Sequence, residues 1–272
     1  MGFESAETLR DGEGRQYHIG LAPGEVAKNV MLVGDPDRAE RVSSRFDNVR
    51  LRRAHREFVT YTGTYKNLEM SVMGTGIGCD NTEIALTELL QCERHPTLIR
   101  VGSCGALQEP IDLADVVIST GSVRLESTSL GFVDESYPAV AHHEVVLAVI
   151  SATKSLGLPI HAGLTACASG FYGWQSRKNP IFEPRFLDLP DRLASWGVMN
   201  YEMETSTLFT LASLAGVRAG AVCGVFANRP KNCFVDDDQK KLAETRAIDC
   251  GLRAFEILAS MGEGPYTIDY TS

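Results

Sequence analysis

The stretch Thr97-Leu98-Ile99-Arg100-Val101-Gly102-Ser103-Cys104-Gly105-Ala106 decides the fold and points to its chemistry. Its first half, residues 97–101, is an apolar run that predicts a buried strand. Its second half carries two glycines, which let the backbone come close to a ligand. Arg100 stands among apolar neighbours, and burying an unpaired arginine is costly. Arg100 therefore either pairs with a structural carboxylate or belongs to an anion site, and the sequence leaves both open.

Short apolar strands and helical patterns alternate on both sides of this stretch. We expect further strands at residues 29–33, 114–123, 160–167 and 217–226, and a hairpin formed by 55–65 and 70–73. We expect helices at residues 37–46, 81–92, 143–156, 204–214 and 237–261. Such alternation is typical of an α/β domain with a largely parallel central sheet. It predicts one domain over residues 17–272, preceded by a flexible polar extension over residues 1–16.

Composition narrows the class of protein. The 272 residues include 35 acidic and 26 basic ones, for a net charge of −9, and no basic stripe indicates a nucleic-acid partner. No apolar run approaches the roughly 20 residues that span a membrane, and the N-terminus is unlike a secretory signal. The seven cysteines include no CxxC pair, which favours reduced, mostly buried thiols. We therefore expect a cytoplasmic protein without nucleic-acid or membrane partners.

Ligands of such sheets bind beyond the carboxyl ends of the strands. Four segments fit this position: residues 34–38, 74–78, 102–105 and 226–229. In the first, Gly34 and the helix start favour an anion, and Arg38 adds a charge. A plain turn, with Asp35 or Asp37 as the helix cap, explains the same segment apart from Arg38. The second, Gly74-Thr75-Gly76-Ile77-Gly78, lacks the spacing and the lysine of nucleotide-binding loops.

A third arginine lies in His55-Arg56-Glu57-Phe58, which we expect to be part of an alternating strand. Exposure of Arg56 to solvent is the simpler interpretation of that residue. Three arginines with glycine-rich turns in an acidic protein nevertheless suggest a small, multiply charged anion. Phosphate fits this description well.

Four motifs in a fixed order make the chain recognisable: residues 33–38, 55–58, 100–105 and Val198-Met199-Asn200-Tyr201-Glu202-Met203-Glu204. Together they resemble the nucleoside phosphorylase family, most closely its uridine phosphorylase branch, from about residue 17 to residue 261. The resemblance implies one three-layer αβα domain around a distorted mixed central sheet. It also implies a pentosyltransferase without a catalytic cofactor, which uses inorganic phosphate to convert uridine into uracil and ribose 1-phosphate. A dimer, sometimes built into hexamers, would be its smallest active unit.

The resemblance also assigns residues to subsites. It implies that phosphate is held by Gly34, Arg38, Arg100 and Ser103 of one subunit and by Arg56 of its neighbour. It implies that the ribose is held by Glu204 on the 2′- and 3′-hydroxyls, with Met203 beneath the sugar, Glu202 nearby and His18 of the partner on the 5′-hydroxyl. Without the resemblance, His18 would be a surface residue of a mobile segment.

The chemistry of the reaction agrees with these roles. A glycosidic bond breaks through a transition state with positive charge on the ribose, and phosphate against the sugar both stabilises that charge and attacks. A carboxylate on the ribose diol fixes the ring, and Glu204 near a helix start suits this role. Alternatively, Glu202 and Glu204 are acids favoured by the helix dipole.

The candidate segment for binding the base is Phe171-Tyr172-Gly173-Trp174-Gln175-Ser176-Arg177. Gln175 can donate to and accept from uracil, Arg177 can stabilise charge on the departing base, and Phe171 can stack on it. A polar surface loop anchored by Trp174 is the alternative.

A purine enzyme of this family needs an aspartate after the late strand, and Gly224-Val225-Phe226-Ala227-Asn228-Arg229 has none. Phe226 and Ala227 would form an apolar wall, and Arg229 would brace the glutamine loop. This favours a pyrimidine substrate over a purine nucleoside or methylthioadenosine. A hydrolytic nucleosidase and a silent nucleoside-binding protein are further alternatives, but neither needs three phosphate arginines. Ser176 and the Ser103-Cys104 pair depart from the branch and leave the use of deoxyuridine or thymidine open.

Two further features have simpler explanations. Some family members bind a cation at the dimer interface, and oxygen atoms of Glu57, Ile77, Asp80 and Asn81 could hold K⁺ or Ca²⁺ here. Ordinary interface polar residues are the simpler interpretation of that set. Cys104 has no histidine obviously paired with it, so we expect a packed thiol rather than a nucleophile.

Overall fold

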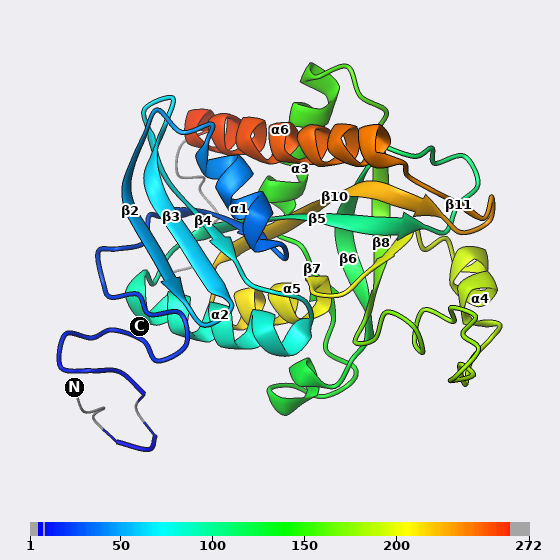
Figure 1. The fold of residues 1–272 in the computed structure, drawn as a ribbon, viewed down its shortest axis with the longest axis horizontal. Helices are drawn as coiled ribbons and strands as arrows, with labels where there is room; N and C mark the ends of the chain where they lie inside the picture. The colour runs from blue at the N-terminus through cyan, green and yellow to red at the C-terminus, as the bar shows by residue number, and fades with distance from the viewer. Residues whose placement is uncertain (1–4, 8, 262–272) are drawn as a thin grey trace.

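Helices cover both faces of one mixed β-sheet in the computed structural model of the chain, which describes residues 5–7 and 9–261 (Figure 1). One face carries α1 (Pro36–Ser43), α3 (His143–Ser155) and α6 (Asp237–Met261), and the other carries α2 (Cys79–Cys92) and α5 (Thr205–Leu214). Separate clusters of buried apolar side chains fill the two interfaces. The layers confirm the expected αβα class. A short helix, α4 (Leu189–Ser195), and a 3₁₀ turn, η1 (Thr128–Gly131), lie at the periphery.

The sheet has eleven strands in the order β11-β10-β6-β8-β9-β5-β1-β4-β3-β2, with β7 paired to β6. Their bounds are β1 Asn29–Val33, β2 Asn48–His55, β3 Phe58–Tyr65, β4 Leu68–Gly74, β5 Thr97–Ala106, β6 Val116–Leu125, β7 Ala139–Val140, β8 His161–Ala168, β9 Asn200–Glu202, β10 Arg218–Asn228 and β11 Cys233–Phe234. The long central helices and strands lie close to their expected positions.

Strand β2 was not expected, because it has no apolar alternation. It is the edge of the sheet, is mostly exposed and carries Arg50, Arg52 and Arg53. Charged side chains are typical of edge strands, where they oppose pairing with other chains. The prediction that Arg56 lies within a strand was wrong: it occupies the turn between β2 and β3, with a φ of 51°.

Half of the sheet closes on itself. Strand β10 pairs with both β5 and β6, and β6, β8, β9 and β5 complete a ring. Hairpins and antiparallel ring strands make the sheet mixed, so the largely parallel sheet expected from element order alone was wrong.

Two of the expected ligand-binding segments lie inside strands rather than beyond them. Residues 102–105 and 226–228 were expected after the strand ends, yet β5 and β10 continue through them. The reason is mutual pairing, since Ala227 lies opposite Gly105 and Asn228 opposite Ala106. These segments therefore form one rigid surface.

The described part of the N-terminal extension contacts the domain. Nη1 of Arg15 donates to the carbonyl of Gly20 at 2.8 Å and pairs with Glu25 at 2.8 Å, and the amide of Gln16 donates to the carbonyl of Leu21. The division between residues 1–16 and 17–272 stays a prediction.

All seven cysteines are free and five are buried, which confirms the expected unbridged, mostly buried thiols. Within residues 5–7 and 9–261, no helix combines the length and apolar composition needed to cross a membrane.

Candidate active site

The candidate site lies where strand β5 changes neighbours. One edge of β5 pairs with β10 along most of its length. The other edge pairs with β1 as far as Arg100 and with β9 only from Gly105. Between these residues, no strand of the described chain pairs with this edge, and we call residues 101–104 the β5 gap. Backbone groups in such a gap need other partners, and the carbonyl of Val101 accepts a hydrogen bond from Arg38.

Glycines allow three segments to meet at this gap. A Cβ atom added to Gly34 would lie 3.3 Å from the carbonyl oxygen of Gly76 and 3.9 Å from Nη1 of Arg100. A Cβ atom at Gly102 would lie 2.9 Å from Nη2 of Arg100. The segments 34–38, 74–78 and 102–105 therefore converge, as expected from their positions in the sequence.

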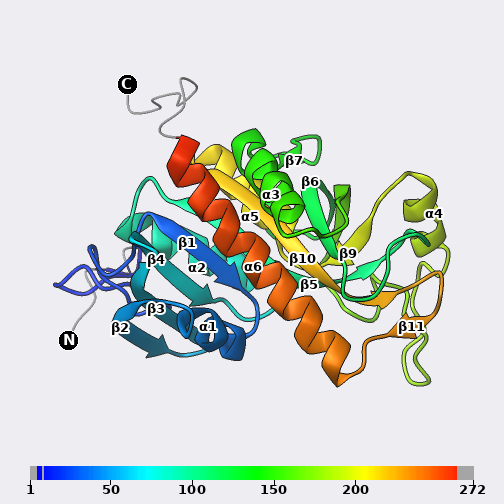
Figure 2. The same cartoon turned by 90° about the horizontal axis from the view of Figure 1, so that it is seen from above.

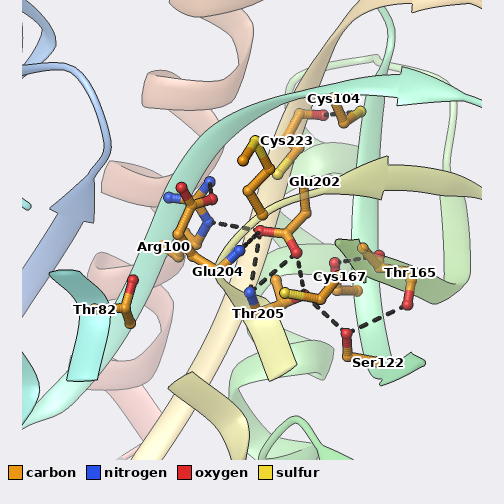
Figure 3. Close-up of polar contacts among 12 residues, drawn as sticks. Thr82, Arg100, Cys104, Ser122, Thr165, Cys167, Glu202, Glu204, Thr205 and Cys223 are labelled. Carbon is orange, nitrogen blue, oxygen red and sulfur yellow. Dashed lines mark hydrogen bonds and ion pairs between the residues drawn. The ribbon is translucent and has the colours of Figure 1, made fainter. Parts of the chain in front are cut away.

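Arg100 pairs with two buried carboxylates (Figure 3). Its Nε donates to Glu202 at 3.0 Å, and its Nη2 donates to Glu204. Burial alone would lower the pKa of Arg100, but the charges of Glu204 and Glu202 raise it overall. The third nitrogen, Nη1, faces Gly34. Arg100 is thus paired with two carboxylates and still presents its Nη1 atom toward the β5 gap.

The two carboxylates have different surroundings. Glu202 accepts from the amides of Glu204 and Thr205, at 2.9 and 3.0 Å, and from the Thr205 hydroxyl at 2.5 Å. Glu202 is therefore fixed at the start of α5, as the helix-dipole alternative proposed. Glu204 accepts from the Gly78 amide at 2.7 Å, and burial raises its pKa although Arg100 opposes this.

Arg38 is buried and aimed at the same gap. It donates to Glu244 of α6 at 3.0 Å and to the Val101 carbonyl at 3.3 Å. Asp35 is the cap of α1 and accepts from the amide of Asp37, which confirms one of the two expected caps. Ser103 lies half-buried on β5, opposite Gly224.

The base-binding candidates lie together around the loop after β8. Gln175 is buried, and the guanidinium of Arg177 stacks 4.0 Å from the ring centre of Phe171. Arg229 donates to the carbonyl of Gln175 at 3.0 Å, which confirms the expected brace. On the wall opposite, Cβ of Ala227 is 3.9 Å from the Cβ position of Gly105.

This loop concentrates positive charge. Among the described residues, neither Arg177 nor Arg229 forms an ion pair with a carboxylate. Burial lowers the pKa of both side chains, and the charge of Arg229 lowers that of Arg177 further. Phe226 is half-buried, and a cavity of about 620 Å³ adjoins the loop, lined in part by Trp174 and Ser169.

His18 and Arg56 make no contact with the Arg100 cluster within the described chain. They belong to a separate surface patch, which we call the Tyr17 patch and which consists of Tyr17, His18, His55 and Arg56. Arg56 donates to the Tyr17 hydroxyl at 2.6 Å and lies over its ring, and His55 bonds the carbonyl of His18. The imidazole of His18 is held by Glu88 at 2.7 Å.

The candidate cation ligands are only partly gathered. The amide of Asn81 and the side chain of Glu57 both lie beside Gly76, and Ile77 is exposed. The carboxylate of Asp80 instead accepts from Thr128. The described residues contain no group of three or more His, Cys, Asp or Glu side chains suited to a metal ion. The interface cation stays a prediction.

Several site residues were missed from the sequence. The amide of Gly78 and the carboxylate of Glu244 both contact expected residues, but their partners are 126 and 206 positions away. Only the buried position of Glu244 in the apolar pattern of α6 could have signalled it. Cys104 is a buried thiol with a pKa raised by burial, as expected for a packed rather than a nucleophilic cysteine.

Comparisons with known proteins identify the family of the chain. Residues 28–256 match the family model described as the phosphorylase superfamily. A uridine phosphorylase of Thermococcus kodakarensis is 46% identical over 263 residues, covering 96% of this chain and 93% of that protein. A uridine phosphorylase of Escherichia coli is 36% identical over 85% of this chain and 93% of its own length. A DeoD-type purine nucleoside phosphorylase of Roseobacter denitrificans is 32% identical over 76% of this chain and 85% of its own. The chain belongs to the phosphorylase superfamily.

Proposed function

We propose that the chain is a uridine phosphorylase, which cleaves uridine reversibly into uracil and ribose 1-phosphate in pyrimidine salvage. One observation carries the choice of base: the buried Gln175 lies beside two half-buried arginines, Arg177 and Arg229, that have no carboxylate partner among the described residues. A ligand edge that offers both a donor and carbonyl oxygens suits this set. Several relatives, at 46% identity and below, are uridine phosphorylases, which supports the same substrate.

Phosphate would bind at the β5 gap. Nη1 of Arg100, the Gly34 segment and the hydroxyl of Ser103 border it, and Arg38 lies on Val101 at its edge. Glu204, the proposed ribose ligand, bonds both Arg100 and the Gly78 amide beside the β5 gap. Phosphate bound in the gap would therefore lie below the ribose. The negative charge of the phosphate would stabilise the developing positive charge on the sugar before attack.

Glu204 would accept hydrogen bonds from the ribose 2′- and 3′-hydroxyls, and Met203 would pack beneath the sugar. Glu202 would act indirectly, by fixing Arg100 and the start of α5. Gln175 would then bind the edge of uracil, and Arg177 would stabilise charge on its oxygen as the glycosidic bond breaks. Phe171 would stack on the base, beside the apolar wall of Phe226 and Ala227.

A second subunit would complete the site. Arg56 and His18 share the Tyr17 patch and do not contact their own Arg100 cluster, so they suit donation to a partner. We propose a homodimer in which each Tyr17 patch supplies Arg56 to phosphate and His18 to the ribose 5′-hydroxyl. The reaction needs no catalytic cofactor in this proposal. A structural K⁺ or Ca²⁺ near Glu57 would require ligands from both subunits, and a cytoplasmic location is also part of the proposal.

The test is to incubate the protein with uridine, deoxyuridine, thymidine and inosine, with and without phosphate, and to follow base release. We expect phosphate-dependent release of uracil, with inosine at least about 100-fold slower in kcat/KM, since a mismatched polar edge leaves buried groups unpaired. Release without phosphate would indicate a nucleosidase, and preference for inosine would favour the purine alternative that the DeoD-type relative represents.

A further inference from the structure

Glu244 is a buried carboxylate that the proposed reaction does not use. It lies on the sheet-facing side of α6 with 7% of its surface exposed. One oxygen accepts from Nη2 of Arg38 at 3.0 Å, and the other lies 3.2 Å from Nη2 of Arg41. Arg41 also bonds Asp35 at 2.8 Å and is nearly half exposed, so it joins Glu244 from the solvent side.

The approach of α6 to the gap depends on a glycine. A Cβ atom at Gly224 would lie 2.6 Å from the carbonyl oxygen of Ala243, the residue before Glu244. Gly224 is paired with Ser103 of the β5 gap, so α6 packs closely against the sheet beside the gap. Figure 2 shows α6 crossing the sheet above β5 and β10. The side chain of Glu244 therefore reaches from α6 to Arg38, which lies on α1.

Few other groups hold the guanidinium of Arg38. Its Nη1 bonds the Val101 carbonyl at 3.3 Å, which is near the long end of the normal range. Its Nε is buried without a partner among the described residues. Glu244 is thus the one charged partner of Arg38 in the described chain, and a charge-assisted bond fixes a guanidinium more firmly than a long neutral one.

We propose that Glu244 is a positioning residue for the phosphate substrate: it holds the Arg38 guanidinium at the edge of the β5 gap, where Arg38 meets the anion. The inference rests on the proposed function, because it takes Arg38 to be a phosphate ligand. Glu244 touches neither phosphate nor nucleoside and acts through Arg38 alone. Its removal should therefore affect the KM for phosphate and leave the KM for uridine unchanged.

The experiment compares Glu244→Ala, Glu244→Gln and Arg38→Ala with the double variant Arg38→Ala/Glu244→Ala, in the full chain. Glu244→Ala should raise the KM for phosphate about 10-fold or more, as expected for the loss of a hydrogen bond to a charged group. Glu244→Gln keeps the acceptor but loses the charge, so its KM for phosphate should lie between those of the wild type and Glu244→Ala. Glu256→Ala, which removes a carboxylate of the same helix that pairs with Lys66 and Arg253, is the matched control and should not change either KM.

The double variant identifies the route of the effect. If Glu244 acts through Arg38, adding Glu244→Ala to Arg38→Ala should raise the KM for phosphate no further. Additive effects, an unchanged KM in Glu244→Ala, or tighter phosphate binding in that variant would overturn the proposal. If Glu244→Ala does not fold, Glu244→Asp keeps the charge and withdraws the acceptor by one methylene. It should then raise the KM for phosphate above that of Glu244→Gln, and equal values would overturn the proposal.

Failure of the proposed function gives a different result. If Arg38→Ala itself leaves the KM for phosphate unchanged, Arg38 is no phosphate ligand and the phosphate site is wrong. If Arg38→Ala raises that KM and Glu244→Ala does not, only the role of Glu244 is wrong.

Discussion

Glu202 and Glu204 lie two positions apart and differ because of their partners. Glu202 is saturated by the amides and hydroxyl at the start of α5 and by Arg100, so its carboxylate is structural. Glu204 accepts from one amide and one guanidinium, which leaves acceptor capacity for a ligand. The spacing in the sequence alone does not show that Glu202 and Glu204 have different roles.

The pKa of Glu204 predicts the acid limit of activity. Burial raises this pKa above the ordinary value of 4.5, and the protonated carboxyl can no longer accept from both ribose hydroxyls. We expect kcat/KM for uridine to fall as the pH drops through a pKa above 4.5. The profile of Glu204→Gln, which cannot ionise, serves as control because it reports the ionisation of phosphate. An acid limb shared by both proteins would show that another group sets it.

At the scale of elements, α6 packs against β10 with backbone in the way of any side chain at Gly224. Gly224→Ala would place a methyl group against backbone that cannot rotate away, and such overpacking costs about 1–3 kcal/mol. We expect a lower urea midpoint and also a higher KM for phosphate, because α6 carries Glu244. Gly131→Ala is the control, since no atom lies within 4 Å of its Cβ position. Equal midpoints for the two variants would mean that α6 adjusts without cost.

The helices and strands also show how much of the fold could be predicted from the sequence. Residues 29–33 were predicted at their observed bounds from a short apolar run, and residues 237–261 from the helical spacing of their apolar positions. Strand β2 was not predicted because its exposed edge needs no apolar face, and β5 was predicted too short because its glycines resemble a loop. Arg100 was located by its apolar neighbours, and Arg38 by its position one turn into a helix that follows a strand. Glu244, the partner of Arg38, was not located, because nothing local links positions 206 apart.

At the scale of the whole molecule, the proposed dimer makes a prediction about mixtures. Arg56→Ala and Glu204→Ala chains should each be inactive, because each lacks part of every site. When they are mixed and refolded, half of the dimers should be mixed and each should have one intact site, giving about a quarter of wild-type activity. The measurement is uracil release after refolding.

The matched control mixes Arg100→Ala with Glu204→Ala. Both residues belong to the same subunit's half of the site, since Arg100 bonds Glu204 directly. No arrangement of these chains restores a complete site, so no activity should return. Recovery in the control, or none in the first mixture, would contradict a site shared between subunits.

The ring of strands has a consequence for synthesis of the protein. Strand β5 is made early, but the neighbour that pairs along most of it, β10, follows more than a hundred residues later. A nascent chain that has not yet emerged through Asn228 therefore exposes that edge of β5, with its apolar side chains, to other chains. Because Arg100, which we propose binds phosphate, lies on this strand, ribosomal products that stop before β10 should be aggregation-prone rather than partly active.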